Sequence, residues 1–543
     1  MSSNARAHRS HLKKYEFVLP VALLILSLGI TLPGISWGAP STWHPDEVVY
    51  IAIHALHGQT DFDSSNFNHP HLPIYMMLGL GKILFAYGQT DKEVLIAARI
   101  LAAVLVGLTI VLSYGIPRRM GFNTAVAGIS GLIALSISAL SQYGRFAHND
   151  AFVTFFTTLT IFLLVQYGAS VHTGWLYAAF FASGLAVSSK YSALSLAMVP
   201  AILYLWTMRD VLLKQSLRVL ETLFIGGVLT YLGYAAGTPK ALLWMAFYFK
   251  RLIPALAYNA IYGRQPDSVR GAIGQYEVFA NGVGFPLFLL FMAAFLWGGF
   301  KVLQAYRAKS NTEGLRAILL LCILIIDLPI MLSYNYPVRF FLPLMPLFAV
   351  LSALFLNDLH GLARQTGNSL YPKLIAAGLT AIIVLSSARV ISVMLLFLND
   401  ARIPASEFLA SLPAGASLEH TLYPPTIPRD HFGREHNYPV YFVKTLGGQV
   451  PTSRRYVFNA GEAGLVDRMT DYLVTDSFTS ERFGDSYICE TMPAECELFK
   501  QLETGGSKHY RLLAEFTYRL PSYLPDISID FVNPEIRVYE RIQ

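Results

Sequence analysis

The sequence predicts a polytopic α-helical membrane protein that ends in a small α/β domain. Of the 543 residues, 54% are hydrophobic and 14% are charged, and the mean hydropathy is +0.45. Soluble domains are less apolar and more charged. Apolar runs near the ~20 residues that cross ~30 Å of hydrocarbon recur as far as residue 398. We therefore expect a membrane domain over residues 1–398 and a second domain over residues 399–543.

The apolar runs indicate about eleven transmembrane helices. The first, Phe17–Trp37, follows a basic segment and is long for a cleaved signal sequence, so we interpret it as an uncleaved helix. The others are Val94–Ile116, Ala125–Leu140, Ala151–Tyr167, Leu176–Val187, Tyr191–Met208, Leu220–Tyr234, Val283–Phe300, Ala317–Ser333, Phe340–Leu356 and Leu374–Leu398. The run Pro73–Ala86 lies in the first long loop, residues 38–93, and is a further candidate.

The basic residues predict a cytoplasmic N-terminus. With the N-terminus inside, the cytoplasmic turns carry Arg118, Arg119, Arg209, Lys214, Arg218, Lys301, Arg307, Lys309, Arg316, Arg364 and Lys373, which is the positive-inside pattern. One outer loop, Gly237–Gly282, is basic against this rule. Its first part, Lys240–Ile253, is amphipathic and is expected to lie on the membrane surface. An odd number of spans makes the C-terminal domain extracytoplasmic, in a multi-pass protein of the plasma or inner membrane.

The C-terminal region has the pattern of a small α/β domain. The runs Tyr472–Thr475, Tyr510–Phe516 and Glu535–Tyr539 resemble strands, and Cys496–Leu502 has a helical pattern. Cys489 and Cys496 lie close together in this region. Such a pair is a disulfide candidate in an oxidising compartment and would stay reduced in the cytosol.

Two adjacent carboxylates, Asp46 and Glu47, follow the first apolar run. An enzyme that takes a proton from a hydroxyl at the membrane surface has a use for such a pair. The alternative is that one of them caps the helical run Val48–Leu56. Adjacent residues point about 100° apart on a helix, so we expect the two acids to have different roles.

Other polar residues fall on the same predicted side of the membrane. They are His69, His71, Arg145, His148, Asp150, Lys190, Tyr336 and Arg339. The carboxylates would handle a proton, while Lys190 and Arg339 would hold an anion at the headgroup level. This combination fits chemistry on an amphiphile whose phosphate lies at the interface and whose tail lies in the bilayer.

Each of these residues also has a purely structural explanation. Lys190 and Arg339 would then snorkel to water from the ends of spans, and snorkelling is favoured for Arg99. Asp150 would cap the helix that it precedes. The side chains of His69 and His71 would bond backbone atoms around the neighbouring prolines, while Asp327 and Arg389, inside apolar runs, would pair between helices.

Several classes of protein are excluded. The sequence contains no Walker A loop, no dinucleotide fingerprint and no zinc-type spacing of Cys and His. The net charge of +6 suits anionic lipid headgroups and is too small to indicate nucleic-acid binding.

Five motifs in order resemble a known family. They are Asp46-Glu47, the His-Pro-x-Leu-x-x-Tyr run from His69 to Tyr75, the Arg145 to Asp150 turn, Gly184–Tyr191 and Val338–Pro346. Together they are similar to the GT-C glycosyltransferases of the protein O-mannosyltransferase and aminoarabinose-transferase type, which use a phospholipid carrier. The resemblance covers roughly Phe17 to Leu356.

The resemblance implies an inverting transfer on the outer face of the membrane. A sugar would pass from a polyprenyl phosphate to the hydroxyl of a protein, glycan or lipid acceptor. Asp46 would be the general base, and Glu47 would orient the acceptor or the base. Lys190 and Arg339, with Arg145 behind them, would stabilise the leaving phosphate, whose charge grows in the transition state.

The resemblance also extends to residues around these. His69, Tyr75 and Tyr336 would contribute to binding the donor phosphate or sugar, and Asp150 and His148 would have an acceptor-binding or structural role. Aminoarabinose transferases carry Lys-Pro-Pro where this chain has His69-Pro70-His71, so His69 would replace a lysine or the contact would be absent. Lipid A is thereby disfavoured as the acceptor. No cofactor is expected to be obligatory, although a divalent metal could be accommodated.

Two alternatives stand beside this prediction. A transporter or flippase of lipid-linked sugars would also have many spans, but it would be expected to show internal repeats and helices broken at the midplane. No repeat is visible in the sequence. A lipid-glycan polymerase of another family would use the same outer face. The sugar and the acceptor are not specified by the sequence.

Overall fold

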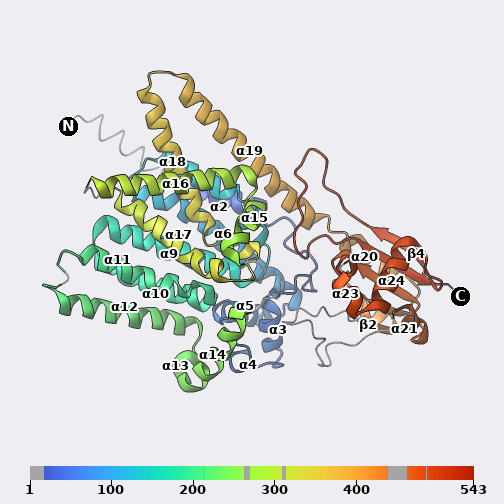
Figure 1. Cartoon of the computed structure of the whole chain (residues 1–543). Helices are drawn as coiled ribbons and strands as arrows, with labels where there is room; N and C mark the ends of the chain where they lie inside the picture. The colour runs from blue at the N-terminus through green and yellow to red at the C-terminus, as the bar shows by residue number, and fades with distance from the viewer. Residues whose placement is uncertain are drawn as a thin grey trace. The chain divides into compact units, whose positions relative to one another are not determined.

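The computed structural model describes residues 17–211, 213–261, 270–308, 313–437, 461–484 and 486–542 (Figure 1). Its contacts divide the chain into two units. The helical unit contains most residues up to Met394, and the C-terminal unit contains Leu395 onward together with the segment Ser36–Pro45. This segment lies within the predicted first domain, residues 1–398.

The helical unit is built from apolar helices, as the sequence predicts. In the described residues, eight segments are long and apolar enough to cross a membrane. They are α6 (Asp91–Arg119), α9 (Asn149–Ser170), Tyr191–Met208 with α11 (Val199–Met208), α12 (Ser216–Gly237), α16 (Phe285–Arg307), α17 (Gly314–Leu332), α18 (Met345–Gln365) and the segment that begins with α19 (Leu370–Leu398). Shorter apolar helices are α2 (Val18–Thr31), α5 (Leu72–Ala86) and α7 (Thr124–Leu135). The polytopic α-helical class is confirmed, while the number of spans stays a prediction.

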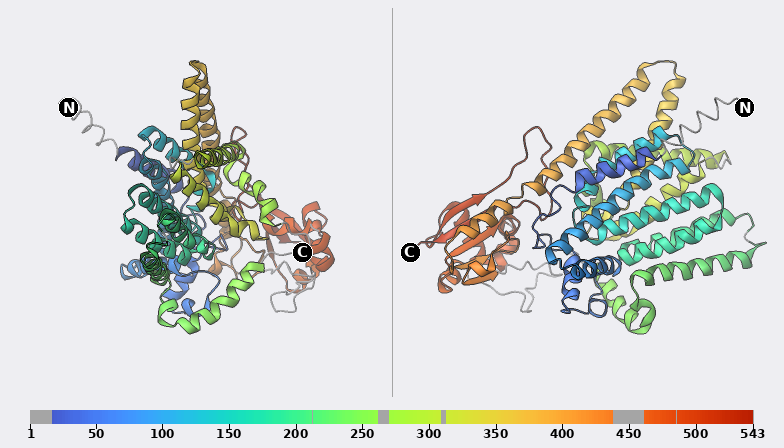
Figure 2. Two further views of the ribbon diagram at one scale, coloured as in Figure 1. Left: turned by 60° about the vertical axis from the view of Figure 1, so that its left-hand side comes forward. Right: turned by 180° about the vertical axis from the view of Figure 1, so that it is seen from behind.

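Close helix packing depends on small residues. The helices α6, α9, α10 (Thr173–Ser189) and α12 lie side by side (Figures 1 and 2). Where α10 meets α12, a Cβ on Gly184 would lie 2.0 Å from the carbonyl oxygen of Thr230, and one on Gly233 would lie 2.2 Å from that of Phe181. Glycine at both positions therefore lets the two backbones approach.

The bounds of the predicted spans differ from those of the helices; the first span, Phe17–Trp37, is helical only over Val18–Thr31. Two further spans show why. The expected helix Ala125–Leu140 is divided into α7 and α8 (Ser138–Tyr143), because the chain is extended at Ile137. The expected helix Phe340–Leu356 begins only at Met345, where Pro346 occupies the first turn, and the preceding η3 (Val338–Phe341) is a short 3-10 helix. Proline is favoured in a first turn because its missing N–H would be unpaired there.

Short elements carry most of the polar residues of the helical unit. The first loop forms α3 (Val49–Leu56) and α4 (Phe62–Ser65) before α5. The basic loop after α12 forms α13 (Lys240–Leu243), α14 (Met245–Ile261) and α15 (Gly271–Val283). Large apolar side chains on α13 and α14, among them Leu243 and Ile253, are exposed, which agrees with the amphipathic pattern.

The C-terminal unit contains a five-stranded sheet in the order β2-β1-β3-β5-β4. The strands are β1 (Ser417–His420), β2 (Arg434–Asn437), β3 (Tyr472–Asp476), β4 (Tyr510–Phe516) and β5 (Ile536–Arg541). β1 pairs in parallel with β2 and β3, whereas β5 pairs antiparallel with β3 and β4. The predicted small α/β region is confirmed.

Helices cover this sheet through two hydrophobic clusters. Successive residues of β3 point to opposite faces, so Leu473 joins one cluster and Val474 the other. The helices of the unit are α20 (Arg402–Ser411), α21 (Gly461–Asp467), α22 (Ser477–Ser480), α23 (Ser486–Thr491) and α24 (Pro493–Thr504), with the 3-10 helices η4 (Arg429–His431) and η5 (Glu481–Gly484). A disulfide between Cys489 and Cys496 joins α23 to α24.

Candidate active site

An ion pair joins Asp46, just before α3, to Arg339 in η3. Arg339 Nη1 donates a hydrogen bond to Asp46 Oδ2, although 293 positions separate the two residues in the sequence. The side chain of Asp46 is 36% exposed and that of Arg339 is 22% exposed, so both are accessible to a ligand. The guanidinium of Arg339 is held by a carboxylate, which argues against the alternative that Arg339 only snorkels to water.

Glu47 has a different environment from its neighbour Asp46. Arg99 donates from Nε and Nη2 to the two carboxylate oxygens of Glu47, each at 2.7 Å, and both side chains are fully buried. The backbone N–H of Ala147 also donates to Glu47 Oε1 at 2.9 Å. The favoured snorkelling of Arg99 is wrong. Glu47 holds the start of α3, directly after Asp46, and its oxygens are already bound, which argues against direct orientation of an acceptor.

A second buried carboxylate, Asp150 in the first turn of α9, binds two side chains. Lys190 Nζ donates to Asp150 Oδ1 at 2.6 Å, and His148 Nδ1 lies 2.5 Å from Asp150 Oδ2. Lys190 Nζ also lies 4.3 Å from the ring centroid of Phe340, the residue after Arg339. The side chain of Asp150 does not cap α9, and Lys190 is held by a carboxylate. These contacts argue against capping and snorkelling, the alternative explanations of the two residues.

His69 completes what we call the central cluster. Its members are Asp46, His69, His148, Asp150, Lys190 and Arg339. The His69 ring centroid lies 6.3 Å from that of His148. Burial, and after it the neighbouring His148, lowers the pKa of His69 to about 4. A neutral imidazole can donate one hydrogen bond to a phosphate, but it lacks the positive charge of a lysine.

Arg145 is buried, with 1% of its surface exposed, and it binds backbone and side-chain groups of neighbouring helices. Its guanidinium donates to the carbonyl oxygen and hydroxyl of Ser141, both at 2.7 Å, and to the carbonyl oxygens of Ile30 at 2.5 Å and Pro33 at 3.4 Å. The predicted phosphate contact of Arg145 is corrected, because these bonds tie the end of α8 to the end of α2.

The two predicted tyrosines are held by other groups. The hydroxyl of Tyr75 donates to Asp63 Oδ2 at 2.6 Å, and Lys240 Nζ lies 2.7 Å from Asp63 Oδ1. The hydroxyl of Tyr336 packs against α15, since a Cβ on Gly274 would lie 2.0 Å from it. In the described residues, neither tyrosine contacts the central cluster through a hydrogen bond that the structure defines. Their proposed contact with the donor stays a prediction.

Three other expectations concern single polar residues. His71 Nε2 lies 2.7 Å from the carbonyl oxygen of Asn66, as the loop interpretation of this histidine expects. Asp327 and Arg389 do make contacts between helices, with Gln275 Nε2 at 3.4 Å and the carbonyl oxygen of Asn281 at 2.7 Å.

An apolar cavity of about 430 Å³ lies among α15, α16, α17 and the start of α18. Its lining includes Phe279, Phe295, Phe341 and Phe348. Phe341 follows Arg339 by two residues, so the cavity and the central cluster share η3. A lipid tail suits such a lining. Among the residues that the structure describes, no group of three or more His, Cys, Asp or Glu side chains could hold a metal ion.

Sequence reasoning missed the partners of these residues. Arg99 was identified only as a charge at a span end, and Lys240 only as part of an amphipathic loop. No local signal predicts that Glu47 pairs with Arg99, 52 positions away. A buried carboxylate needs a cation. The only indirect indication of this pair in the sequence is that Arg99 is a charged residue early in the apolar helix α6.

Comparison with known proteins agrees with this architecture. The family model described as dolichyl-phosphate-mannose-protein mannosyltransferase matches residues 81–253, which is less than half of the chain. No curated protein matches the chain.

Three solved structures are similar in fold. ArnT from Cupriavidus metallidurans bound to undecaprenyl phosphate is 15% identical, with a TM-score of 0.50 over 96% of this chain and 97% of ArnT. Its apo state is 14% identical, with a TM-score of 0.50 over 97% and 98%. The apo oligosaccharyltransferase of Archaeoglobus fulgidus is 13% identical, with a TM-score of 0.49 over 96% of this chain and 76% of that one. The chain has the GT-C fold and resembles the glycosyltransferases of the O-mannosyltransferase and ArnT type.

Proposed function

We propose that this protein is an inverting glycosyltransferase that moves a sugar from a polyprenyl-phosphate carrier to an acceptor hydroxyl on the extracytoplasmic face of the membrane. The observation that carries the proposal is the Asp46–Arg339 pair, an accessible carboxylate bound to an accessible cation. Lys190 supplies a second cation in the same cluster. One group can accept a proton while its neighbours bind a phosphate.

The donor is proposed to be a lipid phosphate. The structurally similar ArnT was solved with undecaprenyl phosphate. The description of the matching family names dolichyl-phosphate-mannose. The apolar cavity that shares η3 with Arg339 has the lining that a polyprenyl chain needs. Mannose and protein are the sugar and the acceptor that the family description names.

The residues of the central cluster would divide the reaction between them. The incoming phosphate attracts Arg339 and Lys190, which leaves the Asp46 carboxylate to accept a hydrogen bond from the acceptor hydroxyl. The hydroxyl oxygen attacks the anomeric carbon as the bond from that carbon to the phosphate oxygen breaks. Asp46 takes the hydroxyl proton, the phosphate leaves with the bonding electrons, and the configuration of the sugar inverts. The two cations stabilise the charge that grows on the phosphate.

The location of the site is part of the proposal. The positive-inside pattern of the basic turns supports an N-terminus in the cytoplasm and a C-terminal unit outside. The disulfide between Cys489 and Cys496 supports this orientation, because such bonds persist in oxidising compartments. No metal is assigned a step, because the proposal gives the stabilisation of the phosphate to Arg339 and Lys190.

The test compares wild type with Asp46→Asn in lipid nanodiscs. Each protein receives a panel of polyprenyl-phosphate sugars and a membrane extract as the acceptor source, and released polyprenyl phosphate is measured. We expect release by wild type only, with donor binding retained in Asp46→Asn. Equal release by both proteins would remove Asp46 as the base. Absence of release with every donor would reject the transferase assignment.

A further inference from the structure

The C-terminal unit contains a second cavity, outside the candidate active site. It has a volume of about 560 Å³. One wall is formed by Pro40–Trp43 and Pro45, and the other includes His420, Leu422–Ile427 and Glu435. The glycosyltransferase chemistry proposed above uses none of the residues of this cavity.

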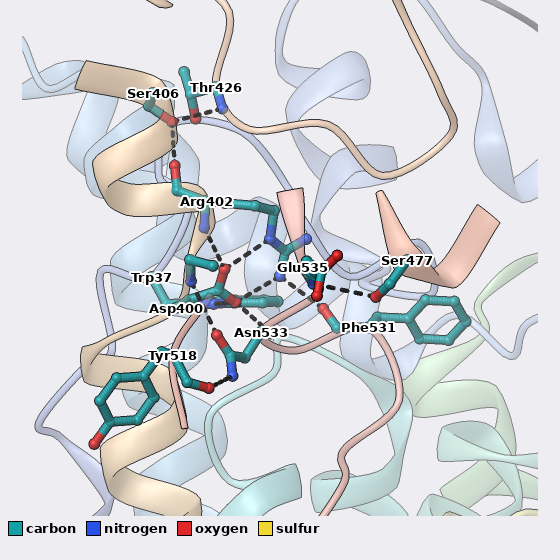
Figure 3. Close-up of polar contacts among 11 residues, drawn as sticks. Trp37, Asp400, Arg402, Ser406, Thr426, Ser477, Tyr518, Phe531, Asn533 and Glu535 are labelled. Atoms are coloured by element: carbon teal, nitrogen blue, oxygen red, sulfur yellow. Dashed lines mark hydrogen bonds and ion pairs between the residues drawn. The ribbon is translucent and has the colours of Figure 1, made fainter. Parts of the chain in front are cut away.

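Helix α20 holds one wall of the cavity through Arg402. The guanidinium of Arg402 lies between two indole rings, 5.0 Å from the centroid of Trp37 and 4.3 Å from that of Trp43. Asp400 fixes this arrangement, because it accepts hydrogen bonds from Arg402 Nη2 at 2.7 Å and from Trp37 Nε1 at 2.8 Å (Figure 3). Trp43 is thereby held in place without a bond to its own indole N–H.

The same helix holds the other wall. Ser406 Oγ, one turn after Arg402, accepts a hydrogen bond from the backbone N–H of Thr426 at 2.9 Å (Figure 3). Thr426 lies in the proline-rich segment that lines the cavity beside Tyr423. Both walls are therefore fixed to one helix, and the cavity is formed before any ligand arrives.

Two buried donors on residues that line this cavity have no hydrogen-bond partner among the residues that the structure describes. They are the indole N–H of Trp43 and Nη1 of Arg402, and both residues line the cavity. Arg402 is fully buried. Buried polar groups are nearly always hydrogen-bonded, because an unpaired one has lost its water without replacement. A ligand oxygen in the cavity would satisfy these donors.

The charges of the lining indicate a neutral ligand. Asp400 neutralises Arg402, and His420 Nε2 lies 3.3 Å from Glu435 Oε1. The lining therefore offers donors, a carboxylate acceptor and flat apolar surfaces from Tyr423 and the prolines, and both Arg402 and Glu435 already have a side-chain partner. Sugar hydroxyls donate and accept at once, and the C–H faces of sugar rings are apolar.

We propose that this cavity binds a neutral glycan and that the glycan is the acceptor of the transferase. The second half of this assignment rests on the proposed function. In the sequence, Pro45 lines the cavity and directly precedes Asp46, the proposed base. The segment that recognises the acceptor is thus continuous with the residue that would deprotonate it. A glycan acceptor also extends the reaction class, because the product is a glycan longer by one sugar.

The test measures binding without turnover. Fluorescently labelled full-length protein in lipid nanodiscs is applied to an array of immobilised neutral oligosaccharides of hexoses and pentoses, acidic oligosaccharides and proline-rich peptides. We expect binding to neutral oligosaccharides only. Trp43→Phe keeps the ring and removes the N–H, so it should weaken binding by about 3- to 10-fold. Tyr523→Phe, at an exposed position of the same unit, is the matched control and should bind as wild type does.

The outcomes separate this inference from the proposed function. Binding to peptides or acidic glycans instead, binding to nothing, or equal binding by wild type and Trp43→Phe would overturn the inference. Thermal unfolding of Trp43→Phe checks that its fold is retained. Polyprenyl phosphate release is measured on the same samples. Release without glycan binding would overturn the inference alone, whereas neutral glycan binding without release would reject the transferase and keep the glycan site.

Discussion

Arg339 donates a hydrogen bond to Asp46, so the accessible cation of the central cluster and its accessible carboxylate neutralise each other. Each member of this pair has a separate use in the proposed reaction. Arg339 would turn to the phosphate of the donor, and Asp46 would turn to the hydroxyl of the acceptor. Donor binding would then release the base, which favours an order in which the donor binds first.

Replacement of Arg339 should weaken donor use. Arg339→Gln keeps a polar side chain but removes the charge, and hydrogen bonds to charged groups contribute about 1.5–3 kcal/mol. We expect the KM for the polyprenyl-phosphate sugar to rise by about 10- to 100-fold, measured as released polyprenyl phosphate against donor concentration. Arg209→Gln removes an exposed ion pair with Asp210 instead and is expected to leave the KM unchanged. Equal kinetics of Arg339→Gln and wild type would assign Arg339 a structural role.

Disruption of the buried Glu47–Arg99 pair should destabilise the protein. Arg99→Met leaves the Glu47 carboxylate buried without its cation. Removal of one partner of a buried ion pair lowers the free energy of unfolding by about 3–5 kcal/mol. The double variant Arg99→Met/Glu47→Gln removes the stranded charge and should recover part of this free energy of unfolding. Denaturant unfolding in detergent measures the free energy of unfolding of wild type, the single variant and the double variant.

An exposed ion pair provides the comparison. Arg511 is 69% exposed where it binds Glu540, so Arg511→Met should lower the free energy of unfolding by less than about 1 kcal/mol. If Arg99→Met were no more destabilising than Arg511→Met, Glu47 would have to be neutral or hydrated in the native state. In that event Glu47 would again be available for a role toward the acceptor.

The sequence identifies the residues of the candidate site more reliably than it identifies their interaction partners. Asp46, Lys190 and Arg339 were identified because charges at span ends on one side of a membrane must converge at that surface. The pairing of Asp46 with Arg339 depends on how helices 293 positions apart in the chain pack, and no periodicity contains that information. Arg145 carried the same local signal as Arg339, yet its guanidinium is buried against backbone carbonyls.

The fold shows the same division between local and long-range signals. β3, β4 and β5 were predicted within two residues at each end, because runs of apolar and β-favouring residues mark strands. β1 and β2 are four residues each and were missed. They exist because they pair with each other and because β1 also pairs with β3, more than 50 positions after β1. Such pairing leaves little trace in a short segment.

His69 should make stability depend on pH. The pKa of His69 is lowered to about 4 by burial, whereas an unfolded histidine titrates near ~6.5. Between these values the unfolded chain binds a proton that the native state does not, so acidification favours unfolding. We expect His69 to account for a loss of about 3 kcal/mol as the pH falls from 7 to 4.

Denaturant unfolding across this pH range tests the prediction. His69→Gln cannot bind the proton and should show a shallower decline than wild type. His509→Gln, at an exposed position, serves as the control and should follow wild type. Parallel curves for His69→Gln and wild type would mean that His69 titrates alike in both states, and a charged His69 could then contact the phosphate as a lysine would.

The disulfide of the C-terminal unit reports the side of the membrane on which that unit lies. Cys489 and Cys496 are seven positions apart, and closing so short a loop stabilises a fold by about 2 kcal/mol in the chain-entropy account. In intact cells carrying Cys322→Ala, a membrane-impermeant maleimide should label the protein only after treatment with an impermeant phosphine reductant. Labelling that requires lysis would place the C-terminal unit in the cytoplasm and reverse the proposed orientation. Labelling without reductant would show that the bond is absent in cells, and the C-terminal unit would then lack this source of stability.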